Sequence, residues 1–334
     1  MPELTRQLQI LNEFCQLKGW QFRLVDSFAG YLAEVRDGDR SFVTGAGPIP
    51  TFPVNSATFS EIARDKAHCT TLLRDAGLTT IKGDYFFTSD DRKCMRPDGR
   101  ELEDALAYAE QLNYPVFVKP NTGCRGLMAD LVDGPENLSA HFKEISAIDH
   151  IAILQAYIVA PEYRLFCLNG KVRFSYSKSV ATLVGDGKSS IEKLLADYNV
   201  QFAADPSRAL SPLAPFLNER LREKGINRAS VLPEGDKLAL AARANLSTGG
   251  KLSDYQEEIP AKIQDWASEV LRSLPLPLCA IDLFAPEGYD CPEAFQIIEV
   301  NANPAFGGIY EAGHKTMVWA LLEEAAKIAF KINS

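Results

Sequence analysis

Apolar residues repeat along the chain with two different periods, which predict a protein built from both helices and strands. Over residues 4–14 they recur at helical spacing, and over 20–25 they alternate with polar residues as in a half-buried strand. Two apolar segments flank Asp37-Gly38-Asp39, a sequence typical of a β-hairpin. Regular structure is then interrupted by Pro48, Pro50 and Pro53. We therefore expect residues 1–55 to form a small N-terminal α/β unit.

From residue 56 onward, helical and strand-like segments alternate. One helix is expected to begin after Asp65, whose side chain suits a helix N-terminus, and to end before Gly77. Further helices are predicted over 101–112, 189–224, 261–274 and 316–332. Strands are predicted over 84–88, 115–119, 151–157, 163–168, 171–180, 278–284 and 295–300. This order predicts an α/β or α+β fold.

Acidic and amide residues interrupt two apolar strands near the C-terminus. Asp282 lies within one strand, and Glu299 and Asn301 lie two residues apart on the other, so that their side chains share a face. A carboxylate on an apolar strand is costly to bury unless it is paired or bound to a metal. If the strands are neighbours, the three side chains form an all-oxygen site suited to Mg²⁺. The alternative is a set of solvated residues on an exposed strand face.

Two earlier segments are candidates for nucleotide binding. A predicted strand delivers Lys119 to its end, and the loop that follows contains Gly123 and Gly126, whose backbone N–H groups can fold over phosphates. Another predicted strand leads through a connector to Glu162. Such a connector can offer backbone groups to an adenine ring, and Glu162 can accept hydrogen bonds from ribose hydroxyls. Each segment alone is equally compatible with an ordinary turn or hairpin.

A polar segment further along combines Arg243 and Asn245 with the pair Gly249-Gly250. An arginine can stabilise an oxyanion or a phosphate, and glycines allow close approach of the backbone. Taken alone, the segment reads as a polar loop.

Composition narrows the classes of function. The 334 residues are 46% hydrophobic, enough for a sizeable core and for two or three domains. The net charge of −9 repels phosphate backbones, so we expect no nucleic-acid partner. The 7 cysteines are scattered and form no C-x-x-C pair, which argues against a disulfide framework or a zinc site. No apolar run approaches the ~20 residues that span a bilayer, and the N-terminus does not resemble a signal peptide, so we expect a cytoplasmic protein without a membrane partner.

In this order, the motifs together resemble the ATP-grasp superfamily. They comprise a lysine on a helix, Lys119 before a glycine-rich loop, a hinge followed by Glu162, and a terminal D…E-x-N set. The segments 184–189, 231–233 and 244–250 are similar to the ATP-grasp domain of cyanophycin synthetase and of bifunctional glutathione synthetases in particular. The resemblance covers residues 56–330. It implies an ATP-grasp fold whose two α+β subdomains grip ATP, with a helical linker and lid over 56–157 and a core with the metal and acyl-phosphate site over 158–334.

The resemblance also implies roles for the matching residues. Contacts with the phosphates of ATP would come from Lys66, Lys119 and the loop from Gly123 to Gly126. Adenine would be held by Gln155, Ala156, Tyr157 and Ile158, and the ribose by Glu162. Two Mg²⁺ ions, with Mn²⁺ as a substitute, would be bound by Asp282, Glu299 and Asn301. The acyl phosphate and the tetrahedral intermediate would face Arg243 and Asn245, and further phosphate or substrate contacts would come from Arg164 and Lys178. One departure is Gln155, which stands where relatives often carry an acidic residue.

The implied activity is that of an ATP-dependent carboxylate–amine ligase. It would join small amino-acid-like molecules through an acyl phosphate, form a peptide-like amide bond, and release ADP and phosphate. The implied partners are a small-molecule acid and a small-molecule amine, and a homodimer is compatible with this activity. Two alternatives are a non-catalytic nucleotide-binding regulator and an ATP-grasp kinase. Retention of Asp282, Glu299 and Asn301 argues against the regulator, and retention of Arg243 and Asn245 argues against the kinase.

Overall fold

The computed structural model describes residues 4–91, 93–123, 126–200, 215–240 and 251–332. Its helices are α1 (Arg6–Lys18), α2 (Ala57–Arg64), α3 (Lys66–Asp75), α4 (Leu102–Leu112), α5 (Pro135–Ile145), α6 (Ile191–Val200), α7 (Pro215–Glu223), α8 (Ala261–Ser273), α9 (Gly307–Glu311) and α10 (Lys315–Ile332). Its strands are β1 (Gln21–Leu24), β2 (Leu32–Asp37), β3 (Arg40–Gly45), β4 (Gly83–Phe87), β5 (Val116–Pro120), β6 (Asp130–Val132), β7 (Ile151–Ala156), β8 (Glu162–Leu168), β9 (Lys171–Ser179), β10 (Thr182–Val184), β11 (Lys237–Ala239), β12 (Lys251–Gln256), β13 (Leu278–Phe284) and β14 (Gln296–Asn301).

The predicted mixture of helices and strands is confirmed, with boundaries that differ by a residue or two. The long helical region predicted over 189–224 contains α6 and α7, and residues 201–214 between them lie outside the described residues. Several short elements, which are α9, β6, β10 and β11, were not predicted, and neither were α5 and β12. Helix α5 buries Leu138, Phe142 and Ile145 at helical spacing, so its signal was present in the sequence. Strand β12 is mostly polar and lacks an alternating apolar pattern, and it forms only through pairing with β9.

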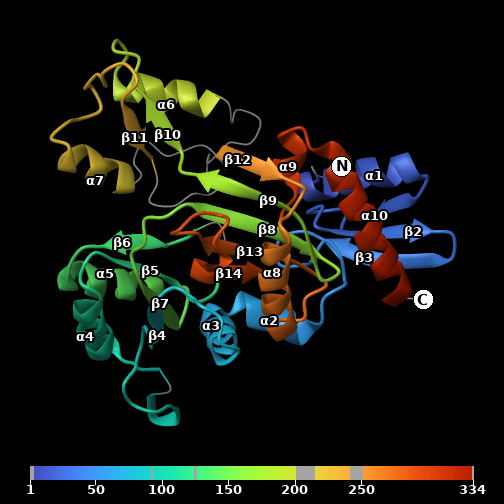
Figure 1. Ribbon diagram of the computed structural model, residues 1–334, viewed down its shortest axis with the longest axis horizontal. Helices are drawn as coiled ribbons and strands as arrows, with labels where there is room; N and C mark the ends of the chain where they lie inside the picture. Colours follow the sequence, from blue (N-terminus) through green and yellow to red (C-terminus); the bar gives the residue numbers. More distant parts are fainter. Residues whose placement is uncertain (1–3, 92, 124–125, 201–214, 241–250, 333–334) are drawn as a thin grey trace.

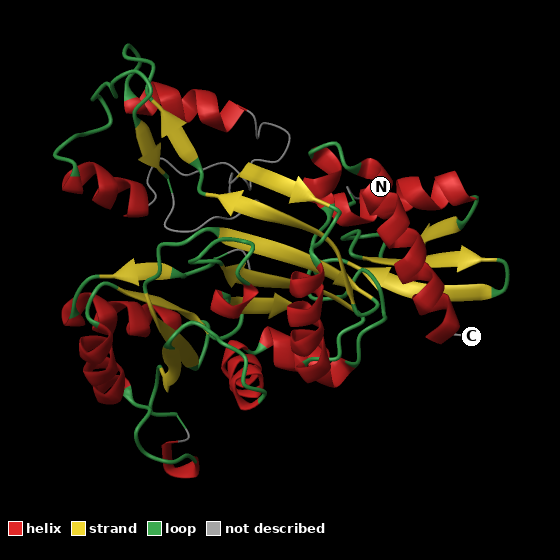
Figure 2. Cartoon of the chain, viewed as in Figure 1, coloured by secondary structure: helices red, strands yellow, loops and turns green. Residues whose placement is uncertain are grey.

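Within the described residues the strands form four sheets, whose orders are β1-β2-β3, β4-β7-β5-β6, β12-β9-β8-β13-β14 and β10-β11. Figure 1 shows the five-stranded sheet at the centre of the molecule. The four-stranded sheet with α4 and α5 lies beside it at lower left, and β10-β11 with α6 and α7 lies at upper left (Figure 1). Figure 2 shows the N-terminal unit on the opposite side, next to α10.

The four-stranded sheet has one face covered by helices. Val116, Val118 and Leu154 point into a core formed with α4 and α5. Because side chains alternate along a strand, Phe117, Lys119 and Gln155 point from the opposite face. That opposite face is the one turned toward a cavity described below.

One face of the five-stranded sheet is filled by α3 and α8, which pack on residues such as Cys167, Cys279 and Ile281. The other face changes character along the strands. At one end Phe166, Phe174 and Tyr176 are covered by the N-terminal unit, α9 and α10. Further along the same face lie polar and charged residues, which are Glu162, Arg164, Lys178, Asp282, Glu299 and Asn301. Coverage by the N-terminal unit therefore leaves one end of this face for polar side chains.

The N-terminal unit is joined to the rest of the chain by a shared core and by hydrogen bonds. Phe14 and Phe42 belong to the same apolar cluster as Phe174 and Phe330. The amide of Asn55 donates to the carbonyl oxygens of Leu278 (2.7 Å) and Ala302 (2.8 Å) and accepts from the N–H of Leu278 (2.9 Å). No helix in the described ranges is both long and apolar enough to cross a membrane.

Candidate ATP-binding site

A cavity of about 310 Å³ lies where β7 passes through the connector, residues 157–161, into β8. The four residues predicted to hold adenine, which are Gln155, Ala156, Tyr157 and Ile158, all line it, and so do Glu162 and Lys178. Its other walls include Ile81, Phe117, Val180 and Phe284. A mostly apolar pocket with a few convergent polar groups is typical of a small-molecule site.

The walls come from segments that are far apart in the sequence. Arg74 on α3 donates to the carbonyl oxygens of Ile81 (2.9 Å) and Gly83 (3.0 Å), which holds the segment before β4 against the cavity. The N–H of Ala156 donates to the carbonyl oxygen of Lys82 (2.8 Å). The sequence prediction missed Ile81, Phe117, Val180 and Phe284 because apolar strand residues carry no local sign of lining a cavity rather than a core.

Two residues that line the cavity, Glu162 and Lys178, belong to a cluster of buried ion pairs with Arg164 and Asp282. Arg164 binds Asp282 with two hydrogen bonds of 2.6 Å each. Lys178 lies 2.8 Å from Asp282 and 2.7 Å from Glu162. Burial would raise the pKa of the Asp282 carboxyl, but the charges of Arg164 and Lys178 outweigh it and hold this pKa well below its ordinary value. Asp282 is therefore ionised throughout the physiological pH range.

The residues predicted to bind Mg²⁺ lie on one face of neighbouring strands. Glu299 is the cross-strand partner of Asp282, and Asn301 is two residues further along β14. The Oδ1 atom of Asn301 accepts from the N–H of Asn303 (2.9 Å). An ionised carboxylate has about four acceptor positions, and Asp282 receives two donors from Arg164 and one from Lys178. One acceptor position is left on Asp282, and oxygen ligands suit a hard cation. The described residues contain no group of three or more acidic, histidine or cysteine side chains placed to hold a metal ion, so the metal role of Asp282, Glu299 and Asn301 stays a prediction.

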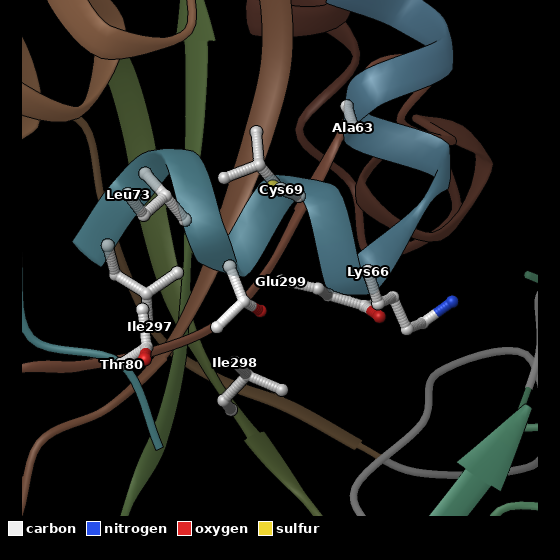
Figure 3. A pocket seen from close by; sticks show the side chains of 10 residues that line it. Ala63, Lys66, Cys69, Leu73, Thr80, Ile297, Ile298 and Glu299 are labelled. Carbon is white, nitrogen blue, oxygen red and sulfur yellow. The ribbon is translucent and has the colours of Figure 1, made fainter. Parts of the chain in front are cut away.

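Glu299 also lines a small pocket beneath α3, together with Lys66 and Cys69. Figure 3 shows the side chains of Lys66 and Glu299 among the residues that line this pocket. Asp65 caps α3 by accepting from the N–H of His68 (2.9 Å), which places Lys66 in the first turn of the helix. Lys66, a predicted phosphate ligand on α3, and Glu299, a predicted metal ligand on β14, thus line the same pocket although they are far apart in the sequence.

The loop after β5 is tied to Lys66. The Nζ atom of Lys66 donates to the carbonyl oxygens of Asn121 (3.2 Å) and Gly123 (3.3 Å). Gly123 and Gly126 both have positive φ, at 118° and 71°, which glycine adopts without strain. Lys119 is 3% exposed on the cavity-facing side of β5. Arg243 and Asn245 lie in 241–250, outside the described residues.

Similar proteins cover a large part of the chain. It is 28% identical over 250 residues to the glutathione biosynthesis bifunctional protein GshAB of Streptococcus thermophilus, covering 70% of the chain and 31% of that protein. It is 29% identical over 261 residues to cyanophycin synthetase of Geminocystis herdmanii, covering 74% of the chain and 28% of that protein. The chain therefore spans about a third of the length of these relatives. No protein-family model matches it.

Solved structures decide the fold. A bifunctional glutathione synthetase from Pasteurella multocida superposes with a TM-score of 0.53 at 22% identity, over 90% of this chain and 40% of that one. A D-alanine–D-alanine ligase from Bacillus anthracis superposes with a TM-score of 0.51 at 14% identity, over 86% of this chain and 73% of that one. The chain has the ATP-grasp fold. The resemblance seen in the sequence to bifunctional glutathione synthetase and cyanophycin synthetase is confirmed.

The ATP-grasp fold explains why the cavity lies between two sheets. The connector that lines it joins β7 of the four-stranded sheet to β8 of the five-stranded sheet, so each sheet supplies one wall. The structure thus brings together the predicted base-binding, ribose-binding and metal-binding residues. Their individual roles stay predictions.

Proposed function

We propose that the chain is an ATP-dependent carboxylate–amine ligase that forms an amide bond between small amino-acid-like molecules. The observation that supports this most is the cavity formed by residues 155–162, which is also lined by Lys178, the ion-pair partner of both Glu162 and the buried Asp282. An apolar cavity with charged side chains in its wall suits a nucleotide base followed by its phosphates. The ligase chemistry is supported by the likeness to the curated ligases.

Two subdomains contribute different parts of the proposed site. Residues 56–157 form the lid, with Lys66, Lys119 and the loop at Gly123 to Gly126 facing the phosphates. Residues 158–334 form the core that carries Asp282, Glu299 and Asn301. Two Mg²⁺ ions held by these oxygens would neutralise charge on the phosphates. The requirement for ATP supports a cytoplasmic location.

In the proposed reaction, a substrate carboxylate attacks the γ-phosphorus of ATP, which forms an acyl phosphate and releases ADP. The amine of the second substrate then attacks the acyl carbon, and phosphate leaves. Lys66 and Lys119 hold the phosphates in line for the first step. Arg243 and Asn245 stabilise the negative charge on the acyl oxygen in the second step.

Replacement of Arg243 tests the ligase assignment. Because its contribution arises mainly in the transition state, Arg243→Ala is expected to lower kcat on the order of 10²-fold or more. Affinity for ATP should change much less, since the cavity that holds the base is formed by other segments. Arg243→Lys should restore little activity, because an ammonium lacks the planar fork of a guanidinium.

The assay combines pairs of amino acids and dipeptides with Mg-ATP, and follows ADP release and product mass. Release of ADP with amide product supports the ligase. Phosphorylated acid without amide would identify a kinase, and nucleotide binding without ADP release would identify a regulator. Normal turnover of Arg243→Ala, or equal losses of activity and ATP affinity, would show that Arg243 is a structural or nucleotide contact.

A further inference from the structure

Gln155 has a buried side-chain oxygen for which the described residues supply no hydrogen-bond partner. The residue is 4% exposed and lines the 310 Å³ cavity, and its Oε1 atom accepts no hydrogen bond from the described part of the chain. Most buried polar atoms are hydrogen-bonded, because an unmet acceptor loses its contacts with water without replacement. This oxygen is therefore an acceptor available to a ligand in the cavity.

The position of Gln155 is well defined. Strand β7 lies between β4 and β5, where Gln155 is the partner of Gly83 on one side and of Phe117 on the other. A Cβ atom on Gly83 would lie 2.7 Å from Cγ of Gln155, so the glycine provides the space in which this side chain packs. Backbone pairing on both sides and close packing at Gly83 fix where the carboxamide can reach. The terminal torsion of the carboxamide is the least restricted of its side-chain torsions.

A carboxamide and a carboxylate differ in what they offer to a ligand. A carboxylate presents acceptors only, whereas a glutamine presents one acceptor and two N–H donors, which exchange places when the terminal group rotates by half a turn. Purine bases differ in whether position 6 carries a hydrogen-bond donor or an acceptor. Adenine carries an amino donor at position 6, and hypoxanthine carries an oxo acceptor there.

We propose that Gln155 reads position 6 of the purine base, and that its carboxamide makes the cavity tolerant of 6-oxo purine nucleotides as well as of ATP. Oε1 accepts from the 6-amino group of adenine, and after rotation Nε2 donates to the 6-oxo group of hypoxanthine. The nearby cavity walls Ile81 and Phe117 offer apolar side chains, so neither replaces this contact. This inference rests on the proposed function, since it takes the cavity to be the site of the base.

The test compares Mg-ATP with inosine triphosphate, which has the 6-oxo group and lacks the 2-amino group of guanine. Wild-type affinities, measured by calorimetry on the full chain, are expected to lie within about tenfold of each other. Gln155→Glu places a carboxylate against the 6-oxo oxygen. It should raise the preference for ATP by roughly tenfold to hundredfold, the range expected for an unmet buried acceptor.

Two further variants complete the design. Gln155→Met keeps the size of the side chain but removes both hydrogen-bonding groups, so it should weaken both nucleotides and bring their affinities closer together. The matched control is Gln21→Glu, the same change at an exposed position on β1, which should leave both affinities as they are in the wild type.

The outcomes separate this inference from the proposed function. If ATP binds but Gln155→Glu leaves the preference between the two nucleotides unchanged, Gln155 does not read position 6 and the inference is wrong. If the wild type binds inosine triphosphate more than about tenfold more weakly than ATP, the tolerance is wrong. If the wild type binds neither nucleotide, the proposed function itself fails.

Discussion

Asp282→Asn is expected to remove stability as well as activity, whereas Glu299→Gln should remove activity alone. Both variants lose a charged oxygen of the proposed Mg²⁺ site. They differ in burial, because the Asp282 side chain is 4% exposed and lies between the buried side chains of Arg164 and Lys178. Glu299 is half-buried and lines the pocket beneath α3.

The magnitude follows from the ion-pair cluster. In Asp282→Asn, Lys178 keeps Glu162 as a partner at 2.7 Å, but Arg164, with 15% of its side chain exposed, loses the carboxylate that it binds through two hydrogen bonds. Breaking a buried pair by removing one partner costs about 3–5 kcal/mol. The asparagine oxygen still accepts one bond, which favours the lower end, about 3 kcal/mol. The free energy of unfolding of a folded domain is about 5–15 kcal/mol in total, so this loss is large. For Glu299→Gln we expect about 1 kcal/mol or less.

The assay is urea unfolding followed by circular dichroism, together with ADP release at saturating Mg-ATP. With a slope of roughly 3 kcal/mol per molar urea, Asp282→Asn should lower the midpoint by about 1 M. The control is Asp90→Asn, the same change at a side chain that is 83% exposed, which should leave the midpoint and the activity intact. A wild-type midpoint for Asp282→Asn would refute the buried ion-pair cluster. Full turnover in both Asp282→Asn and Glu299→Gln would eliminate the metal site.

Three further predictions concern stability. Asn55→Ala removes three hydrogen bonds to the backbone at Leu278 and Ala302, each worth about 1 kcal/mol. A thermal melt should therefore show that the free energy of unfolding falls by about 3 kcal/mol, and a fall below about 0.5 kcal/mol would contradict the bridging role of Asn55. Gly83→Ala brings a Cβ within 2.5 Å of the carbonyl oxygen of Leu154, so it should lower the free energy of unfolding by about 1–3 kcal/mol and weaken ATP binding in calorimetry. If both the stability and the affinity for ATP stayed as in the wild type, the close packing at Gly83 would be disproved. Burial raises the pKa of Asp282, but its two cationic partners lower this pKa by more, so the ionised carboxylate stabilises the fold above the ordinary pKa of 3.8 and this stabilisation is lost as the pH falls below it. In acid titration, the wild type should therefore lose stability more steeply than Asp282→Asn below about pH 4. Parallel curves for the two proteins would argue against the ion-pair cluster.

Much of the fold is encoded locally and was predictable from the sequence. Helix α3 begins at Lys66 because Asp65 caps it, and the β2-β3 hairpin turns at residues 37–39 because that segment suits a tight turn. The apolar alternation of β7 and β8 depends only on residues close in the chain. The motifs also predicted the ATP-grasp fold, which the superpositions confirm.

The tertiary structure decided which of these local features meet. Arg164 and Asp282 lie 118 positions apart, and only the pairing of β8 with β13 places them opposite each other. The sequence suggested that a buried Asp282 needs a partner or a metal, but not that Arg164 and Lys178 supply the pairing. Likewise, Gln155 is buried because β7 lies between β4 and β5, where Gly83 and Phe117 are its strand partners. Local patterns depend on neighbours in the chain, whereas burial and charge pairing depend on neighbours in space, and these are set only when the sheets assemble.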